Sequence, residues 1–299
     1  MTDNNNPQFL LFAQHGWADN GNSIGRLARA VATPKTIVTV PSLGLIKTFI
    51  SIEPLVRKLE QIATAAIEKY PHTPLKIIGH SMGGLMWLEV LDRNPQWWHK
   101  VHSLILLGSP VGGSNLARII DPFGIGIGTA KCLGRNRRLT AEKIAQHIPT
   151  LSVASDINMG TDGLVTLENT KFDYANWLLV SDIPHSAMRS HPQMISIIQN
   201  FWTNPNLGSP PDLDSTSQFI QRLRRLPGMT DTDYRNFKRS QIVASLADGA
   251  TIHTWKNYLG VNHVYVGKPQ QQCIYAGYVG LIHAAGLEKA IATLVSDNA

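Results

Sequence analysis

Cysteine is almost absent from this sequence, with two in 299 residues. Cys132 and Cys273 stand in unrelated contexts, so the chain has neither a disulfide framework nor a cysteine-based zinc site. A reducing compartment suits such a chain best, and we expect a cytoplasmic location. The length is sufficient to bury a large core without a disulfide or a metal ion.

Long apolar runs and strong charge are lacking too. No stretch approaches the ~18 consecutive apolar residues of a membrane-spanning helix, and the run Phe9 to Ala13 lacks the basic region and the length of a signal peptide. Charged residues make up 16% of the chain and hydrophobic residues 43%, which excludes a disordered or fibrous protein. The net charge of +6 is concentrated only between Arg118 and Lys143. That basic group could favour an anionic lipid surface or an acidic ligand, although a solvated surface is its more common role.

Short apolar runs alternate with helical patterns up to about residue 202, which predicts a mostly parallel sheet with helices on both faces. The expected strands are Phe9 to Ala13, Ile37 to Val40, Leu75 to Ile78, Val101 to Leu107, Thr150 to Ala154 and Ala175 to Val180. The expected helices are Ser23 to Ala32, Glu53 to Tyr70, Met82 to Arg93 and Pro192 to Trp202. Residues 1–203 are therefore expected to form one α/β domain.

A change of pattern marks a second unit. Residues 204–215 combine chain breakers with few apolar side chains and predict a linker. Residues 216–299 predict a small α+β module with antiparallel strands. Its expected helices are Ser217 to Arg225, Asp231 to Ser240 and Leu287 to Val295, and its expected strands are Ile242 to Leu246, Thr251 to Trp255, His263 to Val266 and Cys273 to Tyr278. The small net charge of this module argues against nucleic-acid binding.

The motif Gly-x-Ser-x-Gly occurs twice, around Ser23 and around Ser81. Ser81 follows an expected strand directly and opens an expected helix, which is the strand, sharp turn and helix of a nucleophile elbow. Such a turn points the serine hydroxyl out at the carboxyl end of the sheet, and its glycines leave room where the two backbones nearly touch. Ser23 follows a polar loop without a strand and is better interpreted as a helix N-cap.

At this elbow the sequence resembles the α/β-hydrolase superfamily, in its lipase and esterase branch, over residues 9–202. The resemblance depends on a series of ordered motifs: His15-Gly16-Trp17, Gly79-His80-Ser81-Met82-Gly83-Gly84, Gly108-Ser109-Pro110-x-Gly112-Gly113-Ser114, Asp162-Gly163-Leu164-Val165 and His185. The order serine, acid, histidine along the chain is the one that this fold uses. The resemblance implies an α/β-hydrolase fold with a short lid at about residues 110–148, and no cofactor or metal ion.

Each residue of this set would have a defined role in acyl transfer. Ser81 would attack an acyl carbonyl, His185 would take its proton, and Asp162 would orient the imidazole. The resemblance also implies an oxyanion hole formed by the backbone N–H groups of Trp17 and Met82.

Alternatives exist for the acid and for the base. Asp156 directly follows an expected strand, whereas Asp162 lies in the segment that resembles the acid loop of the family and is favoured. Asp182 is too close to His185 along the chain to be the first choice. His191 is the reserve base, but it stands where a helix is expected to begin.

Two apolar loops are expected near this site. In the lid, Phe123, Ile125 and Ile127 alternate with glycines and suggest a flexible cover for an acyl chain, and His15 is a further candidate for the pocket. A second apolar loop, Leu43 to Ile50, follows the second expected strand. These loops favour a hydrophobic substrate over a sugar or a peptide, and could favour peripheral contact with a membrane surface.

The sequence therefore predicts a serine hydrolase of carboxylic esters with lipid-like or apolar acyl groups. A thioesterase or an acyltransferase would use the same triad, because the shape of the pocket selects the leaving group and the acceptor. A ligand-binding protein of this fold with slow or no turnover is a second class, although a complete triad argues against it. Residues 216–299 could dock over the lid, bind a partner or mediate self-association, and the sequence does not choose among these roles. It does not determine the oligomeric state either.

Overall fold

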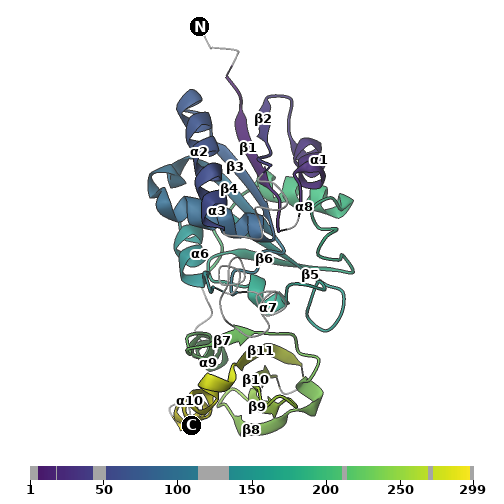
Figure 1. Ribbon diagram of the computed structural model, residues 1–299, viewed down its shortest axis with the longest axis vertical. Coiled ribbons are helices and arrows are strands. Elements are labelled where there is room, and N and C mark those ends of the chain that lie inside the picture. The colour runs from purple at the N-terminus through teal and green to yellow at the C-terminus, as the bar shows by residue number, and fades with distance from the viewer. Residues whose placement is uncertain are drawn as a thin grey trace.

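The computed structural model describes residues 6–17, 19–42, 52–113, 135–210, 214–268 and 272–296. Figure 1 shows two bodies stacked along the long axis, an α/β domain and a smaller module that ends near the C-terminus. The six strands of the domain form one sheet in the order β2-β1-β3-β4-β5-β6, and every neighbouring pair is parallel. They are β1 (Phe9–Gln14), β2 (Thr36–Thr39), β3 (Leu75–His80), β4 (Val101–Leu107), β5 (Thr150–Asp156) and β6 (Asn176–Ser181). The predicted parallel sheet is confirmed.

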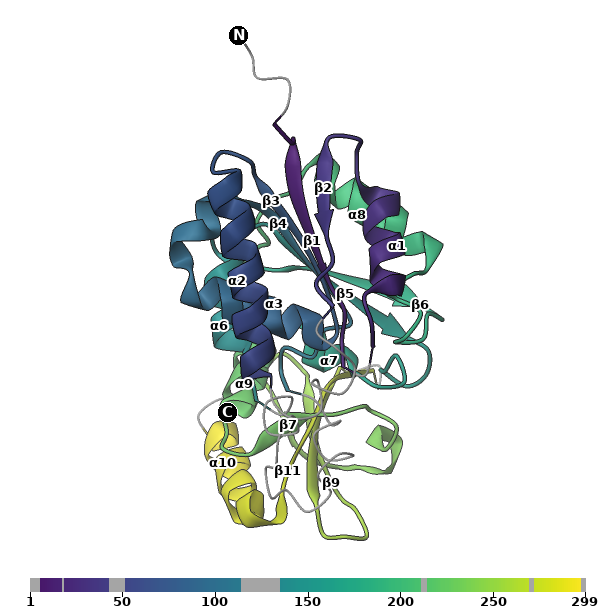
Figure 2. The ribbon, with the colours of Figure 1, turned by 45° about the horizontal axis from the view of Figure 1, so that its top comes forward.

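Helices cover both faces of this sheet (Figure 2). One layer contains α1 (Asn22–Val31) and α8 (Pro192–Thr203), and the other contains α2 (Glu53–Lys69), α3 (Met82–Arg93) and α6 (Arg138–Ala145). Strand β3 explains why two layers form, because Ile77 packs into the core under α2 and α3, and Ile78 into the core under α1 and α8. Successive residues of a strand point to opposite faces, so a continuous apolar run requires cover on both.

The remaining elements of the domain are short. They are η2 (Pro95–Lys100) after α3 and α7 (Leu167–Thr170) between β5 and β6. The N-cap expected at Ser23 is wrong by two positions, because α1 begins at Asn22 and its N-cap is Gly21. Ser23 lies inside the first turn, where its hydroxyl accepts a hydrogen bond from Arg26 Nη2 at 3.4 Å.

The C-terminal module contains a five-stranded antiparallel sheet in the order β7-β11-β10-β9-β8. Its strands are β7 (Met229–Asp231), β8 (Gln241–Ser245), β9 (Thr251–Lys256), β10 (Asn262–Gly267) and β11 (Cys273–Val279). Two helices, α9 (Ser215–Arg224) and α10 (Ala284–Ser296), pack on one face of this sheet. The module also contains two short 3-10 helices, η3 (Phe237–Arg239) and η4 (Leu281–His283). The module therefore has the α+β composition that the sequence predicts.

The helix predicted over Asp231 to Ser240 is wrong. This segment ends β7 and continues as a loop with only the short turn η3. Asp233 Oδ1 accepts a hydrogen bond from the backbone N–H of Arg235 at 3.2 Å, a local bond that competes with helix formation. Asp231 and Tyr234 are also drawn into contacts with the α/β domain. No helix within the described ranges is both long and apolar enough to cross a membrane.

Candidate active site

Ser81 stands between β3 and α3 in a strained backbone conformation, with φ 55° and ψ −126°. A positive φ is unfavourable for a residue with a side chain, so the surrounding structure must hold it. Two backbone hydrogen bonds do so: Ser81 N–H donates to Leu107 C=O at 2.9 Å, and Gly84 N–H donates to Ser81 C=O at 3.1 Å. The turn has the strand, strained serine and helix of a nucleophile elbow.

Close backbone approaches explain two of the glycines around this turn. A Cβ on Gly83 would lie 2.3 Å from the carbonyl oxygen of Gln14, so only glycine lets α3 pass this close to the end of β1. A Cβ on Gly16 would lie 2.9 Å from Cβ of Ser81. The loop after β1 therefore presses directly against the serine.

His185 and Asp162 form a buried pair. The distance from His185 Nδ1 to Asp162 Oδ2 is 2.6 Å, and the side chains are 7% and 2% exposed. The other carboxylate oxygen, Oδ1, accepts hydrogen bonds from the backbone N–H groups of Leu164 at 3.0 Å and Val165 at 2.7 Å. With Nδ1–H donated to the carboxylate, Nε2 of His185 is left to accept a proton.

His80, which precedes the serine, holds the backbone of His185. Its Nε2–H donates to the His185 carbonyl oxygen at 2.9 Å, and the two ring centroids are 4.8 Å apart. Burial, and then the proximity of His185, lower the pKa of His80 well below its usual range, so it stays neutral. The sequence does not indicate this bond, because no motif links residues 105 positions apart.

Gly108, at the carboxyl end of β4, leaves room for this pair. Its φ is 56°, and a Cβ there would lie 3.1 Å from both Asp162 Oδ2 and His185 Nδ1. The elbow, the end of β4, the acid loop and the His185 loop thus meet at one edge of the sheet.

The alternative residues lie in other environments. Asp156 Oδ2 accepts a hydrogen bond from the Tyr234 hydroxyl at 3.2 Å, and its Oδ1 accepts one from Gly160 N–H at 3.0 Å. Asp182 is exposed. His191 is the N-cap of α8, where its Nδ1 accepts from the backbone N–H of Gln193 at 3.3 Å.

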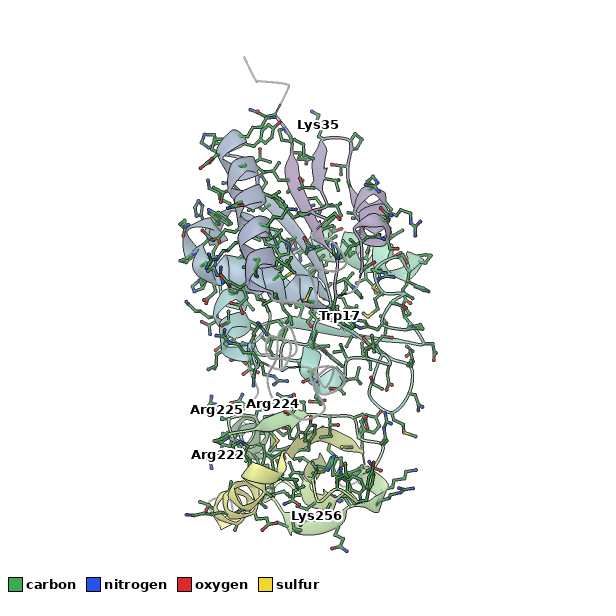
Figure 3. The ribbon with its side chains drawn as sticks, in the orientation of Figure 1. Trp17, Lys35, Arg222, Arg224, Arg225 and Lys256 are labelled. Atoms are coloured by element: carbon green, nitrogen blue, oxygen red, sulfur yellow. The ribbon has the colours of Figure 1, made fainter. Side chains whose placement is uncertain are left out.

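The expected oxyanion-hole and pocket residues fall into three groups. Met82 is the first residue of α3, and Trp17 (Figure 3) directly follows Gly16, which lies against Ser81. His15 is 1% exposed, and its Nδ1 hydrogen-bonds the carbonyl oxygen of Gly16 at 2.9 Å, which stabilises that loop. The expected lid residues Phe123, Ile125 and Ile127 lie outside the described residues, as does the whole loop Leu43 to Ile50.

The two ends of the expected lid are joined to each other and to the domain. Arg137 N–H donates to Val111 C=O at 2.8 Å, and Gly112 N–H donates to Asn169 C=O at 2.8 Å. The side chain of Arg137 donates to Glu89 Oε1 at 2.8 Å. Within the described ranges, no group of three or more His, Cys, Asp or Glu side chains could hold a metal ion.

Comparisons with known proteins concern the family and the fold. Residues 42–172 match the family model described as serine aminopeptidase, S33. The propeptide form of the lipase BlEst2 from Bacillus licheniformis has a TM-score of 0.54 and 13% identity, covering 94% of this chain and 69% of that one. Its mature form has a TM-score of 0.49 and 15% identity, covering 68% and 94%. The phospholipase PlaB from Legionella pneumophila has a TM-score of 0.42 and 14% identity, covering 56% and 46%.

No curated protein sequence matches the chain. At these low identities the structural likeness shows the fold, and the family match covers the elbow and the acid loop. The N-terminal domain therefore has the α/β-hydrolase fold, and residues 42–172 resemble a hydrolase family.

Proposed function

We propose that the protein is a serine hydrolase of carboxylic esters that forms an acyl-enzyme on Ser81. The observation that carries the proposal is the 2.6 Å contact between His185 and Asp162, together with a serine held at φ 55° directly after His80, whose ring bonds the His185 backbone. In this assignment His185 is the general base and Asp162 the orienting acid. The strain at Ser81 has no purpose in a purely structural turn, since an unstrained turn would connect strand and helix at lower cost.

The proposed reaction has two halves. The hydroxyl oxygen of Ser81 attacks the acyl carbonyl while Nε2 of His185 accepts its proton. The tetrahedral intermediate then expels the alkoxide, which takes that proton from His185 and leaves as an alcohol. A water molecule repeats the sequence on the acyl-enzyme, releasing the carboxylic acid and free Ser81.

Stabilisation of the two developing charges is assigned to different groups. The negative oxygen of the intermediate would accept hydrogen bonds from the backbone N–H groups of Met82 and Trp17, each contributing about 3 kcal/mol to lowering the barrier. The positive imidazolium of His185 would be stabilised by Asp162, whose charge is supported by two backbone donors.

Apolar acyl groups, lipid-like or otherwise, are the proposed substrates. The sequence contains two apolar segments, Leu43 to Ile50 and Pro122 to Gly128, which we expect near the carboxyl edge of the sheet. The structural relative from Bacillus licheniformis is a lipase, which is consistent with this choice. Peripheral contact with a membrane surface is proposed as the way such substrates are reached.

A series of p-nitrophenyl esters of increasing acyl length tests the proposal against its alternatives. We expect kcat/KM to rise from acetyl to medium-chain esters, because each buried methylene adds about 0.8 kcal/mol of binding. The Ser81→Ala variant should show no turnover. Preference for acyl thioesters would identify a thioesterase, and preference for aminoacyl arylamides would identify an aminopeptidase. Stoichiometric acylation without release would favour a ligand-binding protein.

A further inference from the structure

The loop that carries Asp162 has an unusual backbone. Met159, Gly160 and Gly163 have φ values of 54°, 87° and 98°. A positive φ is unfavourable for Met159, whose side chain is 51% exposed and therefore does little to fix the loop. A loop with this backbone keeps its shape only where neighbouring groups hold it.

The neighbouring group is Tyr234 of the C-terminal module. Its hydroxyl donates to Asp156 Oδ2 at 3.2 Å, while Asp156 Oδ1 accepts from Gly160 N–H at 3.0 Å. The backbone N–H of Tyr234 donates to the Met159 carbonyl oxygen at 3.4 Å. Its ring covers Gly160, where a Cβ would lie 2.4 Å from Cε1 of the tyrosine. Tyr234 therefore contacts three residues of this segment, Asp156, Met159 and Gly160.

Hydrogen bonds continue from this turn to the acid. Ile157 N–H donates to Thr161 C=O at 2.9 Å, and Asp162 N–H donates to Val165 C=O at 3.1 Å. The hydroxyl of Thr161 donates to the same Val165 carbonyl at 3.0 Å. Residues 156–165 thus form one hydrogen-bonded unit, so a displacement at Gly160 is transmitted to the carboxylate two residues later.

Tyr234 is itself fixed by a buried network between the two bodies. Asp231, three residues earlier, forms an ion pair with Arg138 of α6 and accepts a hydrogen bond from the Tyr275 hydroxyl at 3.1 Å. Arg224 of α9, at the junction in Figure 3, pairs with Glu168 Oε2 at 2.8 Å. The side chains of Arg138 and Asp231 are only 7% and 2% exposed. Such a network fixes the module against the domain more firmly than surface ion pairs would.

We propose that Tyr234 is a positioning residue for Asp162, so that the C-terminal module completes the active site of the α/β domain. The inference rests on the proposed function, because it concerns the orienting acid of that triad. It also gives Asp156 a role: this carboxylate links the module to the acid loop. Burial, and then the charge of Asp156, raise the pKa of Tyr234 to about 12, so its hydroxyl remains protonated and able to donate.

The Tyr234→Phe variant tests this directly, because phenylalanine keeps the ring over Gly160 and removes only the hydroxyl. Active sites are counted with a fluorophosphonate, and kcat is expressed per labelled serine. We expect kcat to fall about fivefold, with KM nearly unchanged, because the lost bond involves a charged acceptor but acts on Asp162 only through the loop. The acid limb of the pH profile should move to lower pH, since a looser Asp162 favours the charged imidazole less.

Two further variants separate positioning from general stability. Tyr258→Phe is the matched control, because Tyr258 belongs to the same module and is 94% exposed; its kcat and pH profile should equal those of the wild type. Tyr234→Ala, which also removes the ring, should lower kcat more than Tyr234→Phe. A loss of folded protein alone would reduce the number of labelled sites without moving the pH profile.

A proton NMR measurement keeps the inference testable even without turnover. The proton shared by His185 Nδ1 and Asp162 should give a low-field signal that is absent in Asp162→Asn and is shifted or broadened in Tyr234→Phe. An unchanged signal, together with unchanged kcat and pH profile, would overturn the positioning role while leaving the triad intact. A rise in kcat would overturn it too, since the module would then restrain the site. Failure of the wild type to label at Ser81 would instead refute the proposed function.

Discussion

The α/β-hydrolase domain and the C-terminal module contribute to the candidate active site in different ways. In the domain, backbone geometry dominates: Ser81 is held in a strained turn, and Gly83 passes too close to Gln14 for any side chain. In the module, single polar side chains dominate, namely Asp231 and Tyr234, which reach across to the domain. A site can thus be built from a local motif together with distant side chains, and only the local motif leaves a pattern in the sequence.

The largest expected effect on kcat separates two acids: Asp162, which contacts His185 of the domain, and Asp156, which contacts Tyr234 of the module. Asp162→Asn should lower kcat by about 10⁴-fold, because an amide cannot hold the required tautomer of His185 or stabilise its charge. Asp156→Asn should lower kcat by only about tenfold, because it weakens the contact with Tyr234 but spares the triad. Ester hydrolysis per labelled serine measures both. Equal losses, or a larger loss for Asp156→Asn, would reverse the assignment of the acid.

Arg138→Met tests the buried junction of the two regions. The free energy of unfolding should fall by about 3–5 kcal/mol, because Asp231 would lose its closest cation while still buried. Urea denaturation followed by tryptophan fluorescence measures the change. The double variant Arg138→Met with Asp231→Leu should recover only part of the loss, because Arg224, whose Nε lies 3.8 Å from Asp231 Oδ2, and the Tyr275 hydroxyl then lose that carboxylate. A single variant as stable as the wild type would show that the network does not hold the module.

Two glycine-to-alanine substitutions compare the space around the backbone in the domain and in the module. Gly83→Ala should destabilise the protein by about 3 kcal/mol or more, because its Cβ meets the carbonyl oxygen of Gln14, which cannot move without displacing β1. Gly286→Ala in α10 is the matched control, since nothing lies within 4 Å of its Cβ position. It should stabilise the protein by up to about 1 kcal/mol. Thermal unfolding distinguishes the two, and a harmless Gly83→Ala would contradict the close approach at the elbow.

The smallest expected effect concerns Lys76, a buried cation far from the module. Its ammonium group lies 3.8 Å from the ring centroid of Phe9 and 4.1 Å from that of Trp202. Burial lowers the pKa of Lys76 from 10.5 to about 8. Below pH 8 the folded protein carries the cost of this buried charge, so Lys76→Met should be about 1 kcal/mol more stable than the wild type.

The pH dependence of that difference follows from the direction of the shift. Between pH 8 and 10.5 the unfolded wild type binds more protons at Lys76 than the folded protein does, so the stability of the wild type rises with pH relative to Lys76→Met. The advantage of the variant should therefore narrow over this window, as measured by urea denaturation at several pH values. A difference that is constant with pH would show that Lys76 titrates normally.

Much of the fold was predictable, because continuous apolar runs and glycine motifs are local signals. The limits of β4 (Val101–Leu107) and α3 (Met82–Arg93) agree with the expected ranges to the residue. The helix expected over Asp231 to Ser240 does not form, because Asp231 and Tyr234 make contacts with the α/β domain. A periodic pattern in the sequence does not reveal such tertiary contacts. For the same physical reason, the junction of Asp231 with Arg138 left no signal in the sequence.

The candidate site was predictable only in part. The sequence favoured Asp162 over Asp156 through the resemblance of its segment to a family loop, and the structure brings Asp162 to within hydrogen-bonding distance of His185. The bond from His80 to the His185 backbone and the contact of Tyr234 with the acid loop could not be predicted, since both join residues that are distant in the sequence. The catalytic roles themselves stay predictions until activity is measured.

Fluorophosphonate labelling of the wild type beside Ser81→Ala and Ser23→Ala tests whether Ser81 is the nucleophile, because the probe reports an activated serine without a known substrate. Both serines stand in the same Gly-x-Ser-x-Gly pattern, but only Ser81 lies in a strained elbow. We expect the wild type and Ser23→Ala to be labelled to the same extent and Ser81→Ala not to be labelled. Labelling that persists in Ser81→Ala, or a folded wild type that resists the probe, would contradict this assignment.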